Sequence, residues 1–249
     1  MSDRNQSASL RRALLVLDHV RLHSGLTLTQ LAEALDLSKS TVSRLAAPLI
    51  EARLLERDRK TGAFRLGHGT LQLGQAYLAT LDLRAVAAEE SRRLVAEVRE
   101  TVHLVVYDPP HVVYIDKVEN QATVRMASRI GSRGPLHSTA VGKAILAWQP
   151  ESAIPEDLPA KTKYTITDHE QLRRELVRIR QRGYSVDDRE NEPEVRCVAA
   201  PIFNHTDTVS AAISVSGLTS RITAARVREV GPVVAAAAAR ISRKLGSSR

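Results

Sequence analysis

The sequence predicts an α+β fold in two parts joined by a helical segment. Apolar residues recur at helical spacing through the first 50 residues. After residue 100, short β-branched runs bounded by Pro, Gly, Asn and Asp alternate with helical segments, which is typical of a sheet covered by helices. We therefore expect an N-terminal domain at residues 1–69, a linker helix at 70–83 and a larger C-terminal domain at 84–249.

The N-terminal domain has the element order of a winged helix-turn-helix. Residues 10–23 are apolar at helical spacing, and Gly25 ends this helix. Thr27 can cap a second helix and Ser38 a third. Two short strands with a polar turn between them follow at residues 54–66. Three helices and a hairpin in this order predict a winged helix-turn-helix domain.

The third helix has an outward face of short, polar and basic side chains at its N-terminus. Free N–H groups at that end suit phosphate, and small hydroxyl side chains let a helix enter the major groove of DNA. An ordinary solvated helix with a good cap would show the same face. Pro48 predicts that the helix ends or bends there, because proline removes a backbone hydrogen bond. The candidate DNA-contacting residues are Ser38, Lys39, Ser40, Thr41, Ser43 and Arg44.

The predicted hairpin, "ERDRKTGAFR", is basic and stands where a wing touches the flanking DNA backbone. Such contacts add affinity that weakens with salt and carry little sequence information. Residues 1–70 hold 11 Lys and Arg against 7 Asp and Glu, an excess of +4 in less than a third of the chain. Together with the helix-turn-helix spacing, this favours DNA binding over a merely solvated helix. The candidate wing residues are Arg57, Arg59, Lys60 and Arg65.

Five short runs predict the strands of the C-terminal domain, and the sheet is expected to be largely antiparallel. The predicted helices of this domain are residues 140–148, 168–182 and 224–244, and Asp82 is expected to start a helix that enters it. The five runs are "TVHLVVYD", "HVVYIDKV", "TVRMAS", "VRCVAAPIF" and "VSAAISVSG".

Composition limits the classes of protein that this chain can represent. The chain has 249 residues and a formal net charge of +8, which indicates an anionic partner such as nucleic acid, a membrane surface or an acidic ligand. A single cysteine, Cys197, excludes an intrachain disulfide. No apolar run is long enough to span a bilayer, and the polar N-terminus lacks the apolar core of a signal peptide. A cytoplasmic protein without a membrane partner is expected, and nothing in the sequence predicts a cofactor.

Five stretches resemble the IclR family of transcriptional regulators over nearly the full chain. The segment "LTLTQLAEALDLSKSTVSRL", with the later "FRLG", resembles its winged helix. "GSRGPLHSTAVGKAILA", "GYSVDDRENEPEVRCVAAPIF" and "SAAISVSG" resemble, in order, three signatures of its effector domain. The resemblance implies a GAF-like effector-binding domain and a homodimer formed through the N-terminal part, which in many members pairs into a homotetramer. It also implies binding of double-stranded operator DNA and a response to a small organic acid, an aromatic acid or another metabolite.

The resemblance also implies an effector pocket. Gly134 and His137 bracket a loop before the "GKA" helix, whose first residues lend backbone groups to ligand oxygens. The chain departs from the family pattern where Arg189 follows two acidic residues and Pro193-Glu194 replaces a glycine, so a stiffer or differently charged loop is expected over the pocket. The implied effector-binding residues are Met126, His137, Ala140, Val141, Asp187, Cys197, Ser214 and Ser216.

Other functions were weighed on the same residues. Cys197, His137 and Asp187 could form the nucleophile, base and orienting acid of a thiol-dependent hydrolase. Against this, Cys197 lies in an apolar strand run with no helix start to acidify it. "GPLHSTAVGK" has the wrong spacing for a phosphate loop, and the dispersed histidines disfavour a zinc site. A sequence-indifferent DNA binder would not need the effector-type domain. A ligand-responsive transcriptional regulator is therefore predicted.

Overall fold

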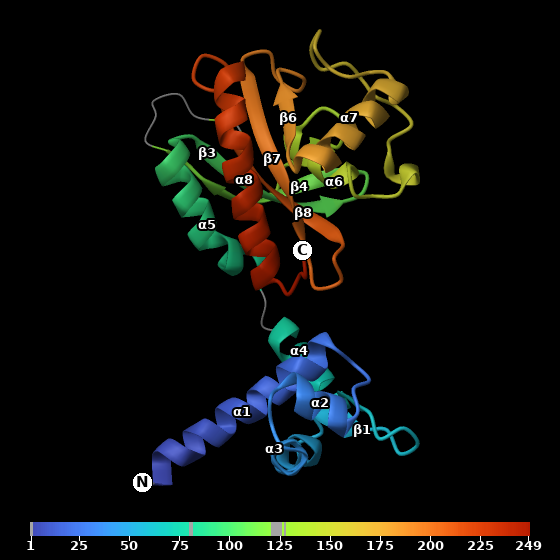
Figure 1. Ribbon diagram of the computed structural model, residues 1–249. Coiled ribbons are helices and arrows are strands. Elements are labelled where there is room, and N and C mark those ends of the chain that lie inside the picture. Colours follow the sequence, from blue (N-terminus) through green and yellow to red (C-terminus); the bar gives the residue numbers. More distant parts are fainter. Residues whose placement is uncertain (1, 80–81, 121–125, 127) are drawn as a thin grey trace. The chain divides into compact units, whose positions relative to one another are not determined.

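The structure is a computed structural model that describes residues 2–79, 82–120, 126 and 128–249 (Figure 1). The chain divides into two compact units, Met1–Thr80 and Leu81–Arg249. Each unit has its own hydrophobic core, and each is described separately below. No helix within the described residues is both long enough and apolar enough to cross a bilayer.

The first unit is a winged helix-turn-helix, as the sequence predicts. It contains α1 (Ser2–Leu22), α2 (Leu28–Ala34), α3 (Lys39–Glu51), the strands β1 (Leu55–Arg57) and β2 (Phe64–Leu66), and α4 (His68–Ala79). The strands pair antiparallel as a hairpin. Thr27 and Ser38 cap α2 and α3. The core between the three helices and the hairpin includes Val16, Leu31, Val42, Leu55 and Phe64.

Two helix boundaries differ from the sequence-based expectation. Helix α1 begins at Ser2 instead of residue 10, because apolar periodicity marks only the part of a helix that packs against a core. Helix α3 does not end at Pro48 but continues to Glu51, and the amide of Ala52 still donates to the Pro48 carbonyl (2.9 Å). Pro48 lies on the exposed side, so burial of Leu49 holds the last turn although proline removes one hydrogen bond.

The second unit is a six-stranded antiparallel sheet with the order β5-β4-β3-β8-β7-β6. Helices α5 and α8 lie on one face, and α6 and α7 lie on the other (Figure 1). Asp82 caps α5, as expected, by accepting from the amide of Arg84 (2.9 Å). The elements are α5 (Leu83–Val98), β3 (Thr101–Asp108), β4 (His111–Val118), β5 (Arg133–Pro135), α6 (Ala140–Leu146), η1 (Glu151–Ala153), α7 (His169–Arg182), β6 (Ser185–Asp188), β7 (Val195–Phe203), β8 (Val209–Leu218) and α8 (Ala224–Lys244).

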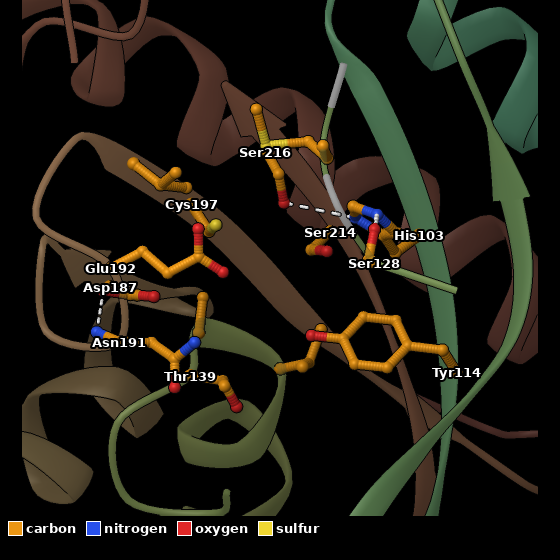
Figure 2. A pocket seen from close by; sticks show the side chains of 14 residues that line it. His103, Tyr114, Ser128, Thr139, Asp187, Asn191, Glu192, Cys197, Ser214 and Ser216 are labelled. Carbon is orange, nitrogen blue, oxygen red and sulfur yellow. Dashed lines mark hydrogen bonds between the residues drawn. The ribbon is translucent and has the colours of Figure 1, made fainter. Parts of the chain in front are cut away.

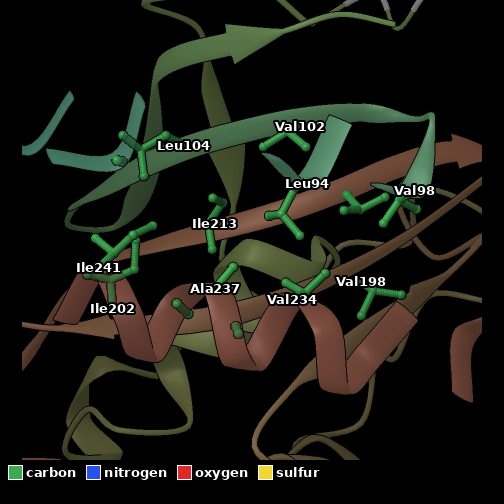
Figure 3. Packing of buried hydrophobic residues seen from close by; sticks show 14 of the residues in the cluster. Leu94, Val98, Val102, Leu104, Val198, Ile202, Ile213, Val234, Ala237 and Ile241 are labelled. Atoms are coloured by element: carbon green, nitrogen blue, oxygen red, sulfur yellow. The ribbon is translucent and has the colours of Figure 1, made fainter. Parts of the chain in front are cut away.

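Alternation along the central strands divides the apolar residues between two cores. Leu104, Val198 and Ile213 point toward α5 and α8, where they meet residues such as Leu94 and Val234 (Figure 3). The side chains at the alternate positions of the same strands point toward α6 and α7 and form the second core. The sheet is therefore buried on both faces, and any polar side chain on the α6 face needs a partner or a cavity.

The strand predictions are confirmed for four of the five runs, which form β3, β4, β7 and β8. The fifth run, residues 123–128, falls mostly outside the described residues, and Met126 and Ser128 are not in a strand. Strands β5 and β6 were not predicted. Both lie at edges of the sheet, and their sequences, "RGP" and "SVDD", lack the β-branched run that marks an interior strand.

Candidate functional site

The outward face of α3 carries the predicted DNA-contacting side chains. The apolar side of the helix, including Val42 and Leu45, is buried in the first unit. Lys39, Ser43 and Arg44 are therefore turned to solvent. At the N-terminus, the Ser38 hydroxyl accepts from the Thr41 amide (3.2 Å) and lies 3.0 Å from the Ser40 hydroxyl. The result is a short-side-chained, basic helix tip with a fixed first turn.

The hairpin presents its basic side chains in two different states. The Arg57 guanidinium donates to the Gly62 carbonyl (3.0 Å) and lies 5.5 Å from the centre of the Phe64 ring. Arg65 pairs with Glu56 (3.1 Å). Arg59 and Lys60 are exposed in the turn, which Asp58 shapes by accepting from the amides of residues 60 and 61. The tip of the hairpin is thus the more available cationic surface.

A cavity of about 50 Å³ opens on the α6 face of the sheet in the second unit (Figure 2). Strand register assembles it from residues far apart in the sequence. Asp187 of β6 is opposite Cys197 of β7, and Cys197 is opposite Ser216 of β8. In the next row, Ser214 is opposite His103 of β3. These side chains point to the same face because residues two apart in a strand share a side.

Seven of the eight predicted effector-binding residues line this cavity: Met126, Ala140, Val141, Asp187, Cys197, Ser214 and Ser216. The eighth, His137, does not. Its ring lies against the carbonyl of Pro159 (3.1 Å), because the loop before α6 turns that side chain away from the sheet. Thr139, which precedes Ala140, lines the cavity and caps α6 by accepting from the Gly142 amide (3.0 Å).

The cavity also contains residues that were not predicted to bind the effector: His103, Tyr114, Ser128, Asn191, Glu192 and Val195. His103 and Tyr114 stand on β3 and β4, where single polar residues in apolar strands look like ordinary sheet positions. Only the sheet order, which places β3 beside β8, brings them to the cavity. Asn191, Glu192 and Val195 lie in the signature "GYSVDDRENEPEVRCVAAPIF", so the resemblance pointed to their segment but not to these residues.

His103 links two hydroxyl groups of the cavity wall. Its Nδ1 lies 3.2 Å from the Ser216 hydroxyl, and its Nε2 lies 2.6 Å from the Ser128 hydroxyl. Burial, with a smaller contribution from Lys117, lowers the pKa of His103 to about 4. The ring is therefore neutral near pH 7, so one nitrogen donates and the other accepts.

Asp187 is a buried carboxyl with its own set of partners. Its Oδ1 accepts from the amides of Glu190 (2.7 Å) and Asn191 (3.3 Å). Burial raises the pKa of Asp187 to about 7, although Lys143 acts in the opposite direction. Lys143 is itself fully buried and forms an ion pair with Glu190. Asp187 can consequently hold or release a proton at neutral pH.

The start of the loop between β6 and β7 is held by contacts to β7 and to the segment before α7. Asp188 accepts two bonds from the Arg196 guanidinium (3.0 and 2.7 Å). The Thr162 hydroxyl donates to the Arg189 carbonyl (2.6 Å), and the Arg189 guanidinium lies 3.9 Å from the centre of the Tyr164 ring. These contacts fix the part of the loop from which Glu192 reaches the cavity.

The same geometry contradicts the thiol-hydrolase alternative. Burial raises the pKa of the Cys197 thiol, which leaves it protonated at neutral pH, whereas a nucleophilic cysteine needs a lowered pKa. His137, the proposed base, bonds the Pro159 carbonyl and does not line the cavity in which the thiol lies.

Comparisons with known proteins agree with both halves of the structure. The family model described as "IclR helix-turn-helix domain" matches residues 9–59, and the model "Bacterial transcriptional regulator IclR C-terminal" matches residues 75–243. The chain belongs to the IclR family. An IclR-family chain is a transcriptional regulator that binds DNA and responds to a ligand, not an enzyme.

Individual IclR-family relatives align over almost the full chain. The HTH-type transcriptional regulator XynR of Escherichia coli is 34% identical over 244 residues, which cover 96% of this chain and 97% of that protein. The transcriptional repressor IclR of Escherichia coli is 33% identical over 252 residues, which cover 98% and 92%. The solved structure of the Agobacterium tumefaciens repressor BlcR is 28% identical, with a TM-score of 0.84, and covers 99% of this chain and 100% of that one.

Proposed function

We propose that this IclR-family regulator reads operator DNA with the outward face of α3 and holds the flanking backbone with the hairpin. The support is the exposed face of the first two turns of α3, where Lys39, Ser40 and Arg44 face solvent, together with a basic hairpin tip. Helices that enter the major groove contact base edges with their N-terminal turns. Arg44 is the side chain best suited to a base or phosphate contact, because a guanidinium can donate two parallel hydrogen bonds.

The effector binds in the cavity on the α6 face. The observation that supports this best is the meeting of Asp187, Cys197, Ser214 and Ser216 from three strands around one polar space. The first amides of α6, at Ala140 and Val141, have no carbonyl within the helix to accept their hydrogen bonds. A small carboxylate or carbonyl compound fits donors of this kind. The volume of about 50 Å³ holds only a few water-sized groups, so the effector is small.

The protein acts as a homodimer formed through its N-terminal part. Leu10, Leu14 and Leu15 on α1 are exposed, as are Leu71 and Leu73 on α4, each by more than half of its surface. Large exposed apolar side chains that recur along helices favour burial against a second copy. A two-fold dimer matches a roughly palindromic operator, and two dimers can pair further into a tetramer.

Effector binding changes the relative orientation of the two DNA-binding domains of the dimer. The change passes through the segment that joins the two units of each chain. In this proposal, residues 1–69 bind DNA, residues 70–83 are the connection and residues 84–249 bind the effector. This connection contains most of α4, which ends at Ala79, and reaches the start of α5 at Leu83. Coupling between two such sites typically amounts to about 1–3 kcal/mol, which changes affinity several-fold to about a hundredfold.

The DNA-binding assignment is tested with Arg44→Ala on a fragment of the protein's own promoter. We expect operator affinity to fall at least about tenfold, which corresponds to about 1.4 kcal/mol, while binding to random DNA falls much less. Arg174→Ala, an exposed arginine on α7, is the matched control and should change neither. Equal operator affinity for Arg44→Ala and the parent at physiological salt would refute the assignment.

The effector assignment is tested separately with Ser216→Ala. The variant should respond to the effector only at higher concentration, while its affinity for the operator without effector stays near that of the parent. A dose-response curve that is the same for variant and parent would place the effector elsewhere. Small organic acids and other metabolites are screened first by the rise in melting temperature that a ligand of the folded state causes.

A further inference from the structure

The charges around the effector cavity are unevenly placed. Two carboxyl groups belong to its wall, from Asp187 on β6 and Glu192 on the following loop. Figure 2 shows both on one side of the space, and the hydroxyls of Tyr114 and Ser214 on the other. Among the described residues of the wall, none is Lys or Arg. A ligand that is only an anion would meet two acids on one side of the cavity.

The hydroxyl side of the cavity is made of donors that stay neutral. Burial raises the pKa of the Tyr114 phenol, so it keeps its proton at neutral pH. Ser214 is buried, and within the described part of the chain no hydrogen bond involves its hydroxyl. Neutral donors of this kind can receive a carboxylate without a cationic side chain.

The carboxyl side has the opposite chemistry. Asp187 uses Oδ1 for two amides of its own loop, which leaves Oδ2 for a ligand. Lys143, the buried cation near Asp187, is already paired with Glu190 and is not part of the wall. A positively charged nitrogen in the cavity would therefore be attracted by Asp187 and Glu192, and no described Lys or Arg of the wall would repel it.

We propose that the effector of this regulator is a small zwitterion, whose carboxylate lies against Tyr114 and Ser214 and whose ammonium group lies between Asp187 and Glu192. This proposal rests on the assignment of the effector cavity in the proposed function, and it adds the chemical class of the ligand. Glu192 is the residue that sets the preference, since its carboxylate stands at the mouth of the cavity and makes no fold-defining contact in the described chain.

The proposal is tested with three compounds of similar size and different charge: β-alanine, propionate and propylamine. Each is titrated into the full-length protein by calorimetry and by thermal shift. We expect β-alanine to bind about tenfold or more tightly than either single-charged compound. In Glu192→Gln the ratio of β-alanine to propionate affinity should fall at least fivefold. Glu194 is an exposed acid of the same loop that does not line the cavity. In Glu194→Gln the ratio of β-alanine to propionate affinity should stay unchanged.

Affinity as a function of pH provides a second readout. An ammonium group favours the ionised form of Asp187, so β-alanine should bind more tightly as the pH rises from about 6 to about 8. Propionate should show the opposite slope, because it binds best while Asp187 is protonated. The charged and titratable groups that face Asp187 are Lys143 on α6, Glu190 and Glu192 on the loop, Cys197 on β7 and Tyr114 on β4.

Three results would overturn the proposal. The first is propionate binding as tightly as β-alanine, and the second is an unchanged ratio in Glu192→Gln. If Ser214→Ala weakens propionate binding in either case, the effector cavity stands and only the zwitterion is wrong. The third is no thermal shift with any of the three compounds. The proposed function is then judged by the Arg44→Ala and Ser216→Ala experiments, which use none of these compounds.

Discussion

At the scale of single residues, Asp187 shows how burial can prepare a carboxyl for ligand binding. Its folded environment favours the protonated form, and its ordinary pKa would leave it ionised at neutral pH. The fold retains this unfavourable burial because Oδ1 holds two amides of the loop that covers the cavity. A buried carboxyl of this kind lowers the free energy of unfolding while no ligand is bound. A bound ligand that pairs with it removes this loss, and such a trade-off is common at functional sites.

Asp187→Asn should therefore stabilise the protein without effector, and more so at higher pH. The pKa of Asp187 is about 7 in the folded state and about 4 when unfolded, so its contribution to stability declines as pH rises between these values and is lost above about 7. Asparagine keeps the oxygen that accepts from the two amides and has no such loss. Urea unfolding at about pH 5 and pH 8 measures the difference. Asp157→Asn, at an exposed position, should change the free energy of unfolding by the same small amount at both pH values. A change in Asp187→Asn that is equally independent of pH would contradict the argument.

At the scale of elements, the hairpin has a structured base and an open tip. Arg57 and Arg65 are engaged by Phe64, Gly62 and Glu56. Their guanidinium groups would have to leave or share these partners to reach DNA. The turn at the tip is held by Asp58, which accepts from the amides of residues 60 and 61 and from the Thr61 hydroxyl. The turn thus places Arg59 and Lys60 in a defined position with their side chains in solvent.

Arg59→Ala and Lys60→Ala should each weaken binding to operator and random DNA by the same factor. Each loses about one phosphate contact, so the slope of log affinity against log salt should become shallower by about 0.9. Arg65→Ala should change the slope less, because the Arg65 charge is already paired with Glu56. Filter binding across a salt series gives these slopes. A larger loss on operator than on random DNA for the tip variants would mean that the hairpin reads bases.

At the scale of the whole molecule, the regulation that we propose needs a second copy of the chain and communication between the two units of each copy. The leucines of α1 and α4 that the dimer proposal uses each expose more than half of their surface to water. The sheet unit, in contrast, buries its own two cores on opposite faces. We therefore expect the first unit to need a partner copy, and the second unit to fold around its own core.

Leu14→Glu should shift the protein from dimer to monomer and reduce operator affinity at least about tenfold, because one head then binds one half-site. Sedimentation velocity at several protein concentrations measures the oligomer. Val177→Glu, which adds the same charge at an exposed apolar position of α7, is the matched control and should leave the dimer intact. A Leu14→Glu protein that remains dimeric at micromolar concentration would show that α1 is not the interface.

Much of this protein follows from local patterns. The caps at Thr27, Ser38 and Asp82 were predictable because one side chain and the next three amides decide them. The buried side of α3 and four interior strands were predictable because apolar periodicity reports which face meets a core. The resemblance to a family supplied seven of the residues that line the cavity, six of them in three short segments and Met126 outside them.

Only the tertiary structure decided the rest. His103 and Tyr114 join the cavity because β3 pairs with β8, and β4 pairs with the other edge of β3. His137 is left out because its loop turns it toward Pro159. The protonation of Asp187 and the charge pattern with Glu192 also come from burial among residues distant in sequence. Local sequence determines which helices and strands form, but the electrostatic field within a cavity depends on which elements pack around that cavity.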